Sequence, residues 1–288
     1  MNDLAAIARL LDALRPWLHG VVIVGGWAHR LHRYHPLANP PAFLPVLTLD
    51  ADVAFSPATP MHGDIAAALA TAGFEQELLG EHTPPVSRYW LGKGGGFYAE
   101  FLAPLHGSGN KRNGEPDATV RKAGVTAQKL RYVDVLLVQP FIVSLGNAIG
   151  IPIDPKVEVR LANPVSFVAQ KLLIHSLRPP RKRSQDVLYI HDTMELFAST
   201  LGDLRAIWSE DVRPSLPRRT AERIERMAQE QFREVTDDIR AAVRIPQDRV
   251  LRPDRMRATC DLGLAAIFGR EDPQPDPAEL VRSRSDSD

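Results

Sequence analysis

Two aspartates stand two positions apart inside an apolar segment of the N-terminal half of the chain. The segment runs from Val46 to Phe55, with Asp50 and Asp52 near its centre. Its apolar residues and polar alternation predict a β-strand, so the two carboxylates, with Thr48 beside them, project from one face. Carboxylates held side by side repel unless a cation neutralises them. Hard oxygen ligands select Mg²⁺ or Mn²⁺, so this pair predicts a metal site.

The alternative is that Asp50 and Asp52 form the exposed face of a half-buried strand. Aspartate is disfavoured in strands, and no lysine or arginine stands nearby in the sequence to balance two of them. The pattern therefore favours the metal site.

A glycine pair precedes this strand. The β-branched run Val21–Val24 predicts a short buried strand, Gly25-Gly26 interrupts it, and residues 27–34 have a helical pattern. Glycines between a strand and a helix let a phosphate approach the backbone. A plain tight turn explains a double glycine equally well, but its position ahead of an Asp-x-Asp strand is more specific than either motif alone.

This order of motifs resembles the polymerase-β-like nucleotidyltransferase superfamily, and within it bacterial proteins near the AbiEii and MenT toxins. The resemblance extends over about residues 20–200 and includes the segments 128–137 and 164–186. It implies an α+β fold, in which a mixed sheet is flanked by helices and followed by a helical C-terminal region. It also implies that Asp50 and Asp52 bind Mg²⁺ and that Gly25 and Gly26 hold the nucleotide.

The same resemblance calls for a third acid on a neighbouring strand. Glu100 is the first candidate, because it lies centrally in the apolar segment 97–102, where an unpaired charge is costly. Aspartate is commoner than glutamate at this position of the superfamily, and Asp134 is the reserve. The alternative for Glu100 is a solvent-facing position on an edge strand.

A third set of candidates lies on a helix predicted for residues 163–177. Lys171, His175 and Arg178 follow one stripe of it and could contact the β- and γ-phosphates. The resemblance supports Lys171 specifically, and it makes Asp186 a further site acid. A solvated basic face and an acid favoured by the helix dipole are the alternatives. Residues 178–183 are expected to form a basic loop.

The chain divides into three parts by its pattern. We expect an α/β nucleotidyltransferase-like domain at 1–162, a helical domain at 163–270 and a disordered tail at 271–288. Further expected elements are helices at 3–18, 65–72, 184 onward, 218–243 and 256–269, strands at 133–143 and 157–161, and a long loop at 105–119. No apolar run approaches the roughly 20 residues of a membrane span, and no signal peptide is recognisable, so a cytoplasmic protein is expected.

These observations predict a Mg²⁺-dependent nucleotidyltransferase that moves a nucleoside monophosphate from a nucleoside triphosphate, ATP included, to an acceptor. RNA such as tRNA, a protein or a small molecule are the acceptors considered. The formal net charge of zero gives no bulk attraction to nucleic acid, so recognition of RNA would need a local basic patch. The alternatives are a non-catalytic nucleotide- or partner-binding protein of the same fold, and the toxin of a toxin–antitoxin pair, with an antitoxin partner.

Overall fold

A single mixed sheet organises the N-terminal part of the molecule. The computed structural model describes residues 3–92 and 96–269, and within them nine strands pair in the order β3-β4-β5-β2-β1-β9-β8, with β7 joining β5, and β6 joining β7. The strands are β1 (Val22–Val24), β2 (Asp50–Ala54), β3 (Phe74–Leu79), β4 (Val86–Leu91), β5 (Phe97–Pro104), β6 (Thr119–Lys122), β7 (Val125–Leu130), β8 (Phe141–Leu145) and β9 (Val157–Leu161). The predicted α+β fold with a mixed sheet is confirmed.

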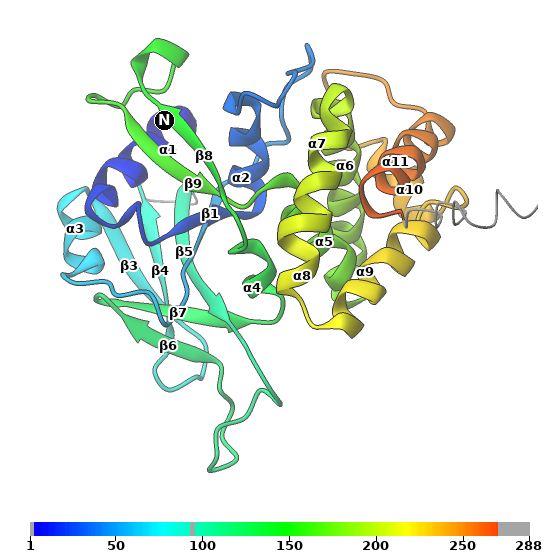
Figure 1. Cartoon of the computed structure of the whole chain (residues 1–288). Coiled ribbons are helices and arrows are strands. Elements are labelled where there is room, and N and C mark those ends of the chain that lie inside the picture. Colours follow the sequence, from blue (N-terminus) through cyan, green and yellow to red (C-terminus); the bar gives the residue numbers. More distant parts are fainter. Residues whose placement is uncertain (1–2, 93–95, 270–288) are drawn as a thin grey trace, which may run out of the picture.

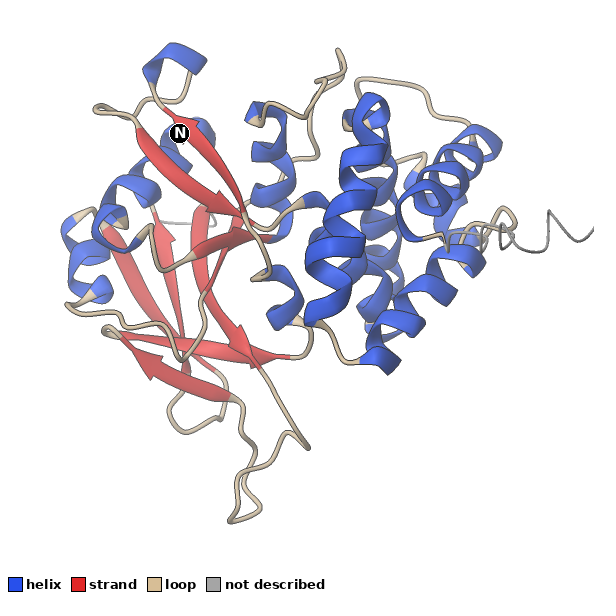
Figure 2. Cartoon of the chain, in the orientation of Figure 1, coloured by secondary structure: helices blue, strands red, loops and turns tan. Residues whose placement is uncertain are grey.

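Helices cover both faces of the sheet. Figure 1 shows α1 (Asp3–Ala13) and α3 (Ile65–Thr71) on one side, with α2 (Gly25–Leu31), α4 (Val133–Leu136) and the C-terminal helices on the other. The C-terminal helices are α5 (Pro164–Ile174), α6 (Pro180–Leu196), α7 (Leu201–Ala206), α8 (Arg213–Ser215), α9 (Arg218–Glu230), α10 (Asp237–Ala242) and α11 (Pro253–Phe268), with a π-helical turn Ile207–Val212 between α7 and α8. The strands therefore lie in one half of the molecule together with α1 and α3, and the C-terminal helices make up the other half (Figure 2).

The start of α5 follows from its sequence. The Asn163 side chain accepts a hydrogen bond from the Ser166 backbone N–H at 2.8 Å, and Pro164 occupies the first turn, where its missing N–H costs nothing. Nine of the 11 residues of α5 are buried, because the helix packs between the sheet side and α6 and α9. The segment that carries Lys171 is thereby fixed in the core.

Several predicted strands differ from the structure. The segment 46–55 forms a strand only from Asp50, and 46–49 is an extended segment whose Leu47 and Leu49 side chains face solvent. The segment 133–143 is a short helix followed by the start of β8, because Tyr132 and Gln139 adopt positive φ and break the strand on either side. Four strands, β3, β4, β6 and β7, were not predicted. Burial shows why for β3, which exposes most of its side chains and so lacks an alternating apolar pattern.

The helix predictions also need correction. The expected basic loop 178–183 is wrong in its second half: α6 begins at Pro180, with Pro179 as N-cap, so residues 181–183 are helical. The predicted helix 218–243 is two helices, because Thr236 caps α10 by accepting from the Ile239 N–H. The helix predicted at 3–18 ends in a 3₁₀ turn, Arg15–Trp17. The predicted tail 271–288 lies outside the described residues, and the domain boundary at 162/163 stays a prediction.

Candidate active site

One cavity of about 530 Å³ is lined by most of the residues that the sequence nominates for chemistry. It opens between β2, β5 and β7 on the sheet side and α5 and α6 on the helical side. The nominated residues that line it are Gly25, Gly26, Thr48, Asp50, Asp52, Glu100, Lys171 and Asp186. Asp134, the reserve for the third acid, is not among the residues that line it, and neither is His175.

Asp50 and Asp52 reach the cavity from the centre of the sheet. On β2, Asp52 pairs in register with Val24 of β1 and with Glu100 of β5. The Thr48 hydroxyl donates a hydrogen bond to the Asp50 carboxylate, so Thr48 contributes even though it precedes the strand. Within the described part of the chain, neither aspartate forms an ion pair with a lysine, arginine or histidine. They are two adjacent carboxylates without a counter-charge of their own.

The two glycines form the first turn of α2 rather than a break before it. Gly25 has a φ of +63°, and a Cβ at this position would overlap the Asp52 carboxylate. A Cβ on Gly26 would come within 2.7 Å of the Tyr189 hydroxyl and 2.8 Å of a Thr48 carbon. Only glycine therefore lets the backbone lie directly against Asp52. The predicted place of the glycine pair beside the aspartates is what the structure shows.

Glu100 faces the same cavity but already has a cationic partner. Arg88 of β4 donates to its carboxylate through Nε at 2.6 Å and through Nη2 at 2.5 Å. The same guanidinium lies 4.6 Å from the centre of the Tyr98 ring. Both nitrogens contact the same oxygen, Oε1, in a charge-assisted contact. Glu100 thus contributes to the cavity as half of an ion pair.

The helical wall of the cavity presents positive charge. Lys171 Nζ lies 2.7 Å from one Asp186 oxygen, and Arg178 Nε lies 3.2 Å from the other. Lys171 and Asp186 are both almost fully buried. Two cations share one carboxylate, so this group carries a net charge of +1, by the count of 2 − 1. His175, the third residue of the predicted stripe, does not line this cavity, and its imidazole lies 3.3 Å from Asp238 and contacts Gln231.

The electrostatics of the cavity centre on Asp52. Burial, together with the neighbouring charges of Asp50 and Glu100, raises the pKa of Asp52 to about 7. Lys171 and Arg178 act on the same carboxyl in the opposite direction, but with smaller effect. Burial and the same aspartates also raise the pKa of the Tyr189 phenol, which lines the cavity beside them. The sheet wall therefore holds more negative charge than its own residues neutralise.

This excess charge is what a divalent cation would balance. Asp50 and Asp52 supply carboxylate oxygens, the hard ligands that Mg²⁺ and Mn²⁺ take. Among the described residues, no three His, Cys, Asp or Glu side chains form a ready-made metal cluster. A site built on two carboxylates suits Mg²⁺, which commonly completes its coordination with water and substrate phosphate.

The sequence relates this cavity to a known family. A sequence model of the family described as "Nucleotidyltransferase" matches residues 2–212, which include every residue nominated for the site. The chain belongs to this nucleotidyltransferase family. The match supports nucleotidyl transfer in general and does not reach the finer AbiEii and MenT resemblance, which stays a prediction.

Other comparisons add little to the family assignment. No curated protein matches the chain. Among solved structures, the crystal structure of JHP933 from Helicobacter pylori is similar over 100% of this chain and 97% of that one, with 11% identity and a TM-score of 0.39. Similarity at that level bears on neither mechanism nor substrate. Within the described residues, no helix is long and apolar enough to span a bilayer.

The candidate active-site cavity of this nucleotidyltransferase is also lined by polar residues that sequence reasoning missed. They lie mainly on two elements, the end of β7 with the turn after it, and α6; they are Gln128, Lys129, Arg131, Tyr132, Gln170, Gln185 and Tyr189. Lys129 and Arg131 are already engaged, by Asp117 and by the carbonyls of Gly107 and Ser108. Because β7 was not predicted, its pairing with β5, which brings these residues to the cavity, was not foreseen.

Proposed function

We propose that this nucleotidyltransferase transfers a nucleoside monophosphate from a nucleoside triphosphate to an acceptor, and that it depends on Mg²⁺ or Mn²⁺ held by Asp50 and Asp52. One observation carries the proposal. In a cavity where Glu100 and Asp186 each have a cationic partner, Asp50 and Asp52 have none among the described residues. Adjacent unpaired carboxylates are costly unless a ligand compensates them.

The protein groups have separate tasks in this account. Asp50 and Asp52 would hold the metal ion, and a bound metal ion would supply a lower pKa for the acceptor hydroxyl and charge neutralisation at the α-phosphate. Lys171 and Arg178, on the opposite wall, bind the β- and γ-phosphates and so stabilise the pyrophosphate that leaves. Asp186 is a positioning residue, because its carboxylate holds both cations before substrate arrives.

The glycine pair determines how close the nucleotide can come. Because Gly25 and Gly26 carry no Cβ, the backbone of the first turn of α2 lies against Asp52 and Thr48. The phosphates of a nucleotide could then approach this backbone closely. A side chain at either glycine would occupy that space.

A second candidate function is nucleotide binding without transfer. The Arg88–Glu100 pair favours it, because an engaged third carboxylate is less available to a second metal ion. In this second candidate function, the chain binds metal and nucleotide through the same residues, but it does not activate an acceptor hydroxyl. Transfer and binding must therefore be measured separately.

The test incubates the full-length chain with Mg²⁺, each α-³²P-labelled nucleoside triphosphate and a cell extract. Asp50→Asn and Asp52→Asn remove the charge of one carboxylate with little change in shape. Glu75→Gln is the matched control, since Glu75 is an exposed acid on β3 of the same sheet. We expect label on an acceptor with the wild type and the control, and a loss of roughly 1,000-fold or more in the two asparagine variants.

The outcomes separate the two candidates. Retained transfer in both asparagine variants would overturn the proposal. If the wild type transfers no label but binds labelled nucleotide only with Mg²⁺, and Asp52→Asn abolishes that binding, the non-catalytic candidate replaces it. The fraction that carries label, whether RNA, protein or small molecules, identifies the acceptor class.

A further inference from the structure

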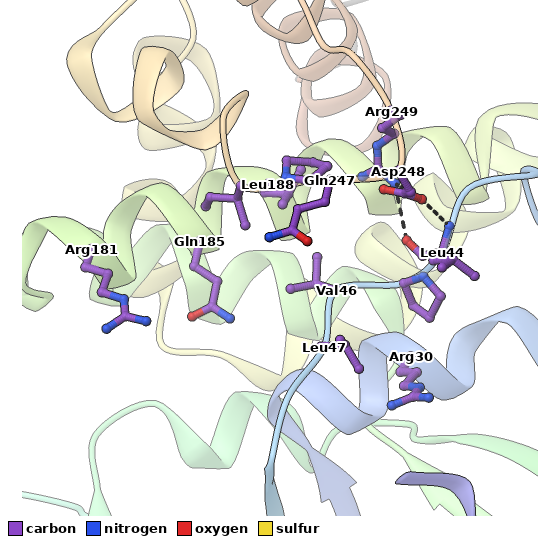
Figure 3. Close-up of a pocket in the computed structure, with 13 residues that line it drawn as sticks. Arg30, Leu44, Val46, Leu47, Arg181, Gln185, Leu188, Gln247, Asp248 and Arg249 are labelled. Carbon is purple, nitrogen blue, oxygen red and sulfur yellow. Dashed lines mark hydrogen bonds and ion pairs between the residues drawn. The ribbon is translucent and has the colours of Figure 1, made fainter. Parts of the chain in front are cut away.

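A second cavity lies directly behind the nucleotide site. It has a volume of about 610 Å³ and is bounded by α6, by residues 44–47 and by residues 245–249 (Figure 3). We call it the rear groove. Gln185 lines both the rear groove and the active-site cavity, and residues 44–47 run directly into Thr48 and Asp50 of the active site. The two spaces are therefore neighbours, with Gln185 at the boundary between them.

Helix α6 serves both cavities with different residues. Lys182, Asp186 and Tyr189 line the active site, whereas Arg181 and Leu188 line the rear groove. Residues 181, 185 and 188 follow i, i+4 and i+7 spacing, so they form one stripe of the helix. In Figure 3, Arg181, Gln185 and Leu188 come from this helix on one side of the groove, with Val46 and Leu47 across from them.

The opposite wall is held rigidly. Asp248 accepts a hydrogen bond from the Leu44 N–H at 2.7 Å, and Arg249 donates to the Leu44 carbonyl at 3.3 Å. Arg249 is itself fixed by both oxygens of the buried Asp192, at 2.6 and 2.7 Å, and by stacking on Phe43 at 3.6 Å. These contacts tie the segment that carries Thr48 to the C-terminal region. The groove is therefore preformed.

The lining of the rear groove is apolar with an uncompensated positive charge. Its apolar residues are Leu44, Pro45, Val46, Leu47, Leu188, Ile245 and Pro246. Leu44 and Leu47 are 68% and 69% exposed, so a large apolar surface here has no protein covering among the described residues.

The charged groups that line the groove differ in whether they are neutralised. Arg249 is neutralised by Asp192, and Arg30 by Asp3 at 3.3 Å. Asp248, the acid of the lining, is occupied by the Leu44 N–H and by Arg249. Arg181 is exposed and has no ion pair within the described part of the chain. The unpaired charge of the groove is therefore that of Arg181, and it is positive. Two amide side chains, Gln185 and Gln247, also line the groove.

From this arrangement we propose that the rear groove binds the acceptor, and that the acceptor is a small molecule with an apolar body and an anionic group. The apolar body covers Val46, Leu47 and Leu188, and the anion pairs with Arg181. Gln185, which lines both cavities, marks the way by which the reactive hydroxyl reaches the α-phosphate. A cationic acceptor is disfavoured, because it would meet Arg181 without a free carboxylate. That this ligand is the acceptor rests on the proposed function, whereas the binding of an apolar anion to the rear groove does not.

The ligand class is tested without knowledge of the acceptor. The probe is 8-anilinonaphthalene-1-sulfonate, an apolar body with one anionic group, and N-phenyl-1-naphthylamine is the same body without the charge. Both are titrated by fluorescence into the full-length wild type, Arg181→Glu, Leu47→Ser and Arg226→Glu. Arg226 is an exposed arginine on α9 that lines neither cavity, so it controls for the change in net charge.

We expect Arg181→Glu to weaken the sulfonate probe about tenfold and the neutral probe less than about twofold, since only the charged contact is lost. Leu47→Ser should weaken both probes, and Arg226→Glu should affect neither. Leu47 and Arg181 are exposed, so these variants retain the fold. Equal affinity of the sulfonate probe for all four proteins would overturn the assignment of the groove to an anion.

The link to catalysis is tested in the labelled transfer assay. The sulfonate probe should inhibit transfer competitively with the extract and not with the nucleotide. Arg181→Glu should lower transfer at least about fivefold while nucleotide binding stays within about twofold of the wild type. If Asp52→Asn loses transfer but Arg181→Glu does not, the proposed function stands and this inference fails. Label on RNA or protein instead of a small molecule would also contradict it.

Discussion

The buried acids of the helical region have cationic partners in the fold, whereas the two aspartates of β2 have none among the described residues. Asp186, Asp192 and Glu225 are all buried on the helical side, and each has an arginine or lysine within 2.8 Å. Asp50 and Asp52 share one cavity with Asp186, yet no cation of the described residues pairs with them. A buried acid whose task is structural has a partner in the fold. In the proposed function, a bound cation compensates the aspartates of β2 instead.

Glu100 lies between these two groups. It stands opposite Asp52 in the sheet register, but it has a cation of its own in Arg88. Because Arg88 compensates its charge, Glu100 does not add a third uncompensated carboxylate to the cavity. Glu100 is therefore closer to the structural acids, although its position is that of a site residue.

The largest expected effect is the loss of stability when one of the paired buried acids of the helical region is removed. Asp192→Ala leaves Arg249 without its buried partner, and we expect the free energy of unfolding to fall by about 3–5 kcal/mol. Urea denaturation measures it. Asp203→Ala, which removes an exposed acid from α7, is the control and should change stability by less than about 0.5 kcal/mol. A loss below about 1 kcal/mol for Asp192→Ala would remove the structural role assigned to these pairs.

The next effect concerns the glycine against Asp52. Gly25→Ala combines a positive φ with a Cβ that overlaps the Asp52 carboxylate, so we expect a loss of about 2–3 kcal/mol in thermal or urea unfolding together with weaker Mg²⁺ binding. Gly150→Ala is the matched control, since Gly150 has a φ of +79° but open space around its Cβ position. It should cost about 1 kcal/mol. Equal losses would show that strain alone, and not contact with Asp52, requires glycine.

A smaller effect is the pH dependence of Asp52. Its pKa is about 7 in the folded protein, above its ordinary value of 3.8, so the folded state holds a proton that the unfolded state has released between these values. The stabilising contribution of that proton is complete below pH 4 and is lost as pH rises through 7. Without metal, the stability of Asp52→Asn relative to the wild type should rise by about 1–3 kcal/mol between pH 5 and 8.

Addition of Mg²⁺ provides the control for this pH effect. A cation at Asp50 and Asp52 should restore the wild type at pH 8 and leave Asp52→Asn unchanged, as followed by melting temperature. A difference between the two proteins that does not change with pH would contradict the raised pKa.

The smallest effect concerns Glu100. Arg88→Gln frees this carboxylate and should increase Mg²⁺ affinity about two- to fivefold, because the sheet wall gains one uncompensated negative charge. Isothermal titration calorimetry measures the change. An unchanged affinity would place Glu100 outside the electrostatic reach of the metal.

Local spacing was enough to predict the central part of this molecule. Asp50 and Asp52 were found because strand periodicity places them on one face, and Gly25 because a glycine pair follows a short apolar run. The cavity brings both motifs together with Lys171 and Asp186, which the family resemblance nominated. Their roles in catalysis remain part of the proposed function.

What the sequence did not predict depends on contacts between distant residues. The Arg88–Glu100 pair requires the register of β4 against β5, and β4 had no recognisable pattern. The rear groove requires Asp248 and Arg249 to meet Leu44, some 200 positions away. The early start of α6 was missed because a basic run reads as a loop, whereas Pro180 fits the first helical turn.

Measurement of metal binding shows directly whether Asp50 and Asp52 hold a divalent cation. Free Mn²⁺ is followed by electron paramagnetic resonance as it is titrated with the wild type, with the Asp50→Asn/Asp52→Asn double variant and with Glu75→Gln. We expect the wild type and Glu75→Gln to deplete the free Mn²⁺ signal equally, and the double variant to leave it unchanged. Mn²⁺ binding by the double variant with the affinity of the wild type would contradict it.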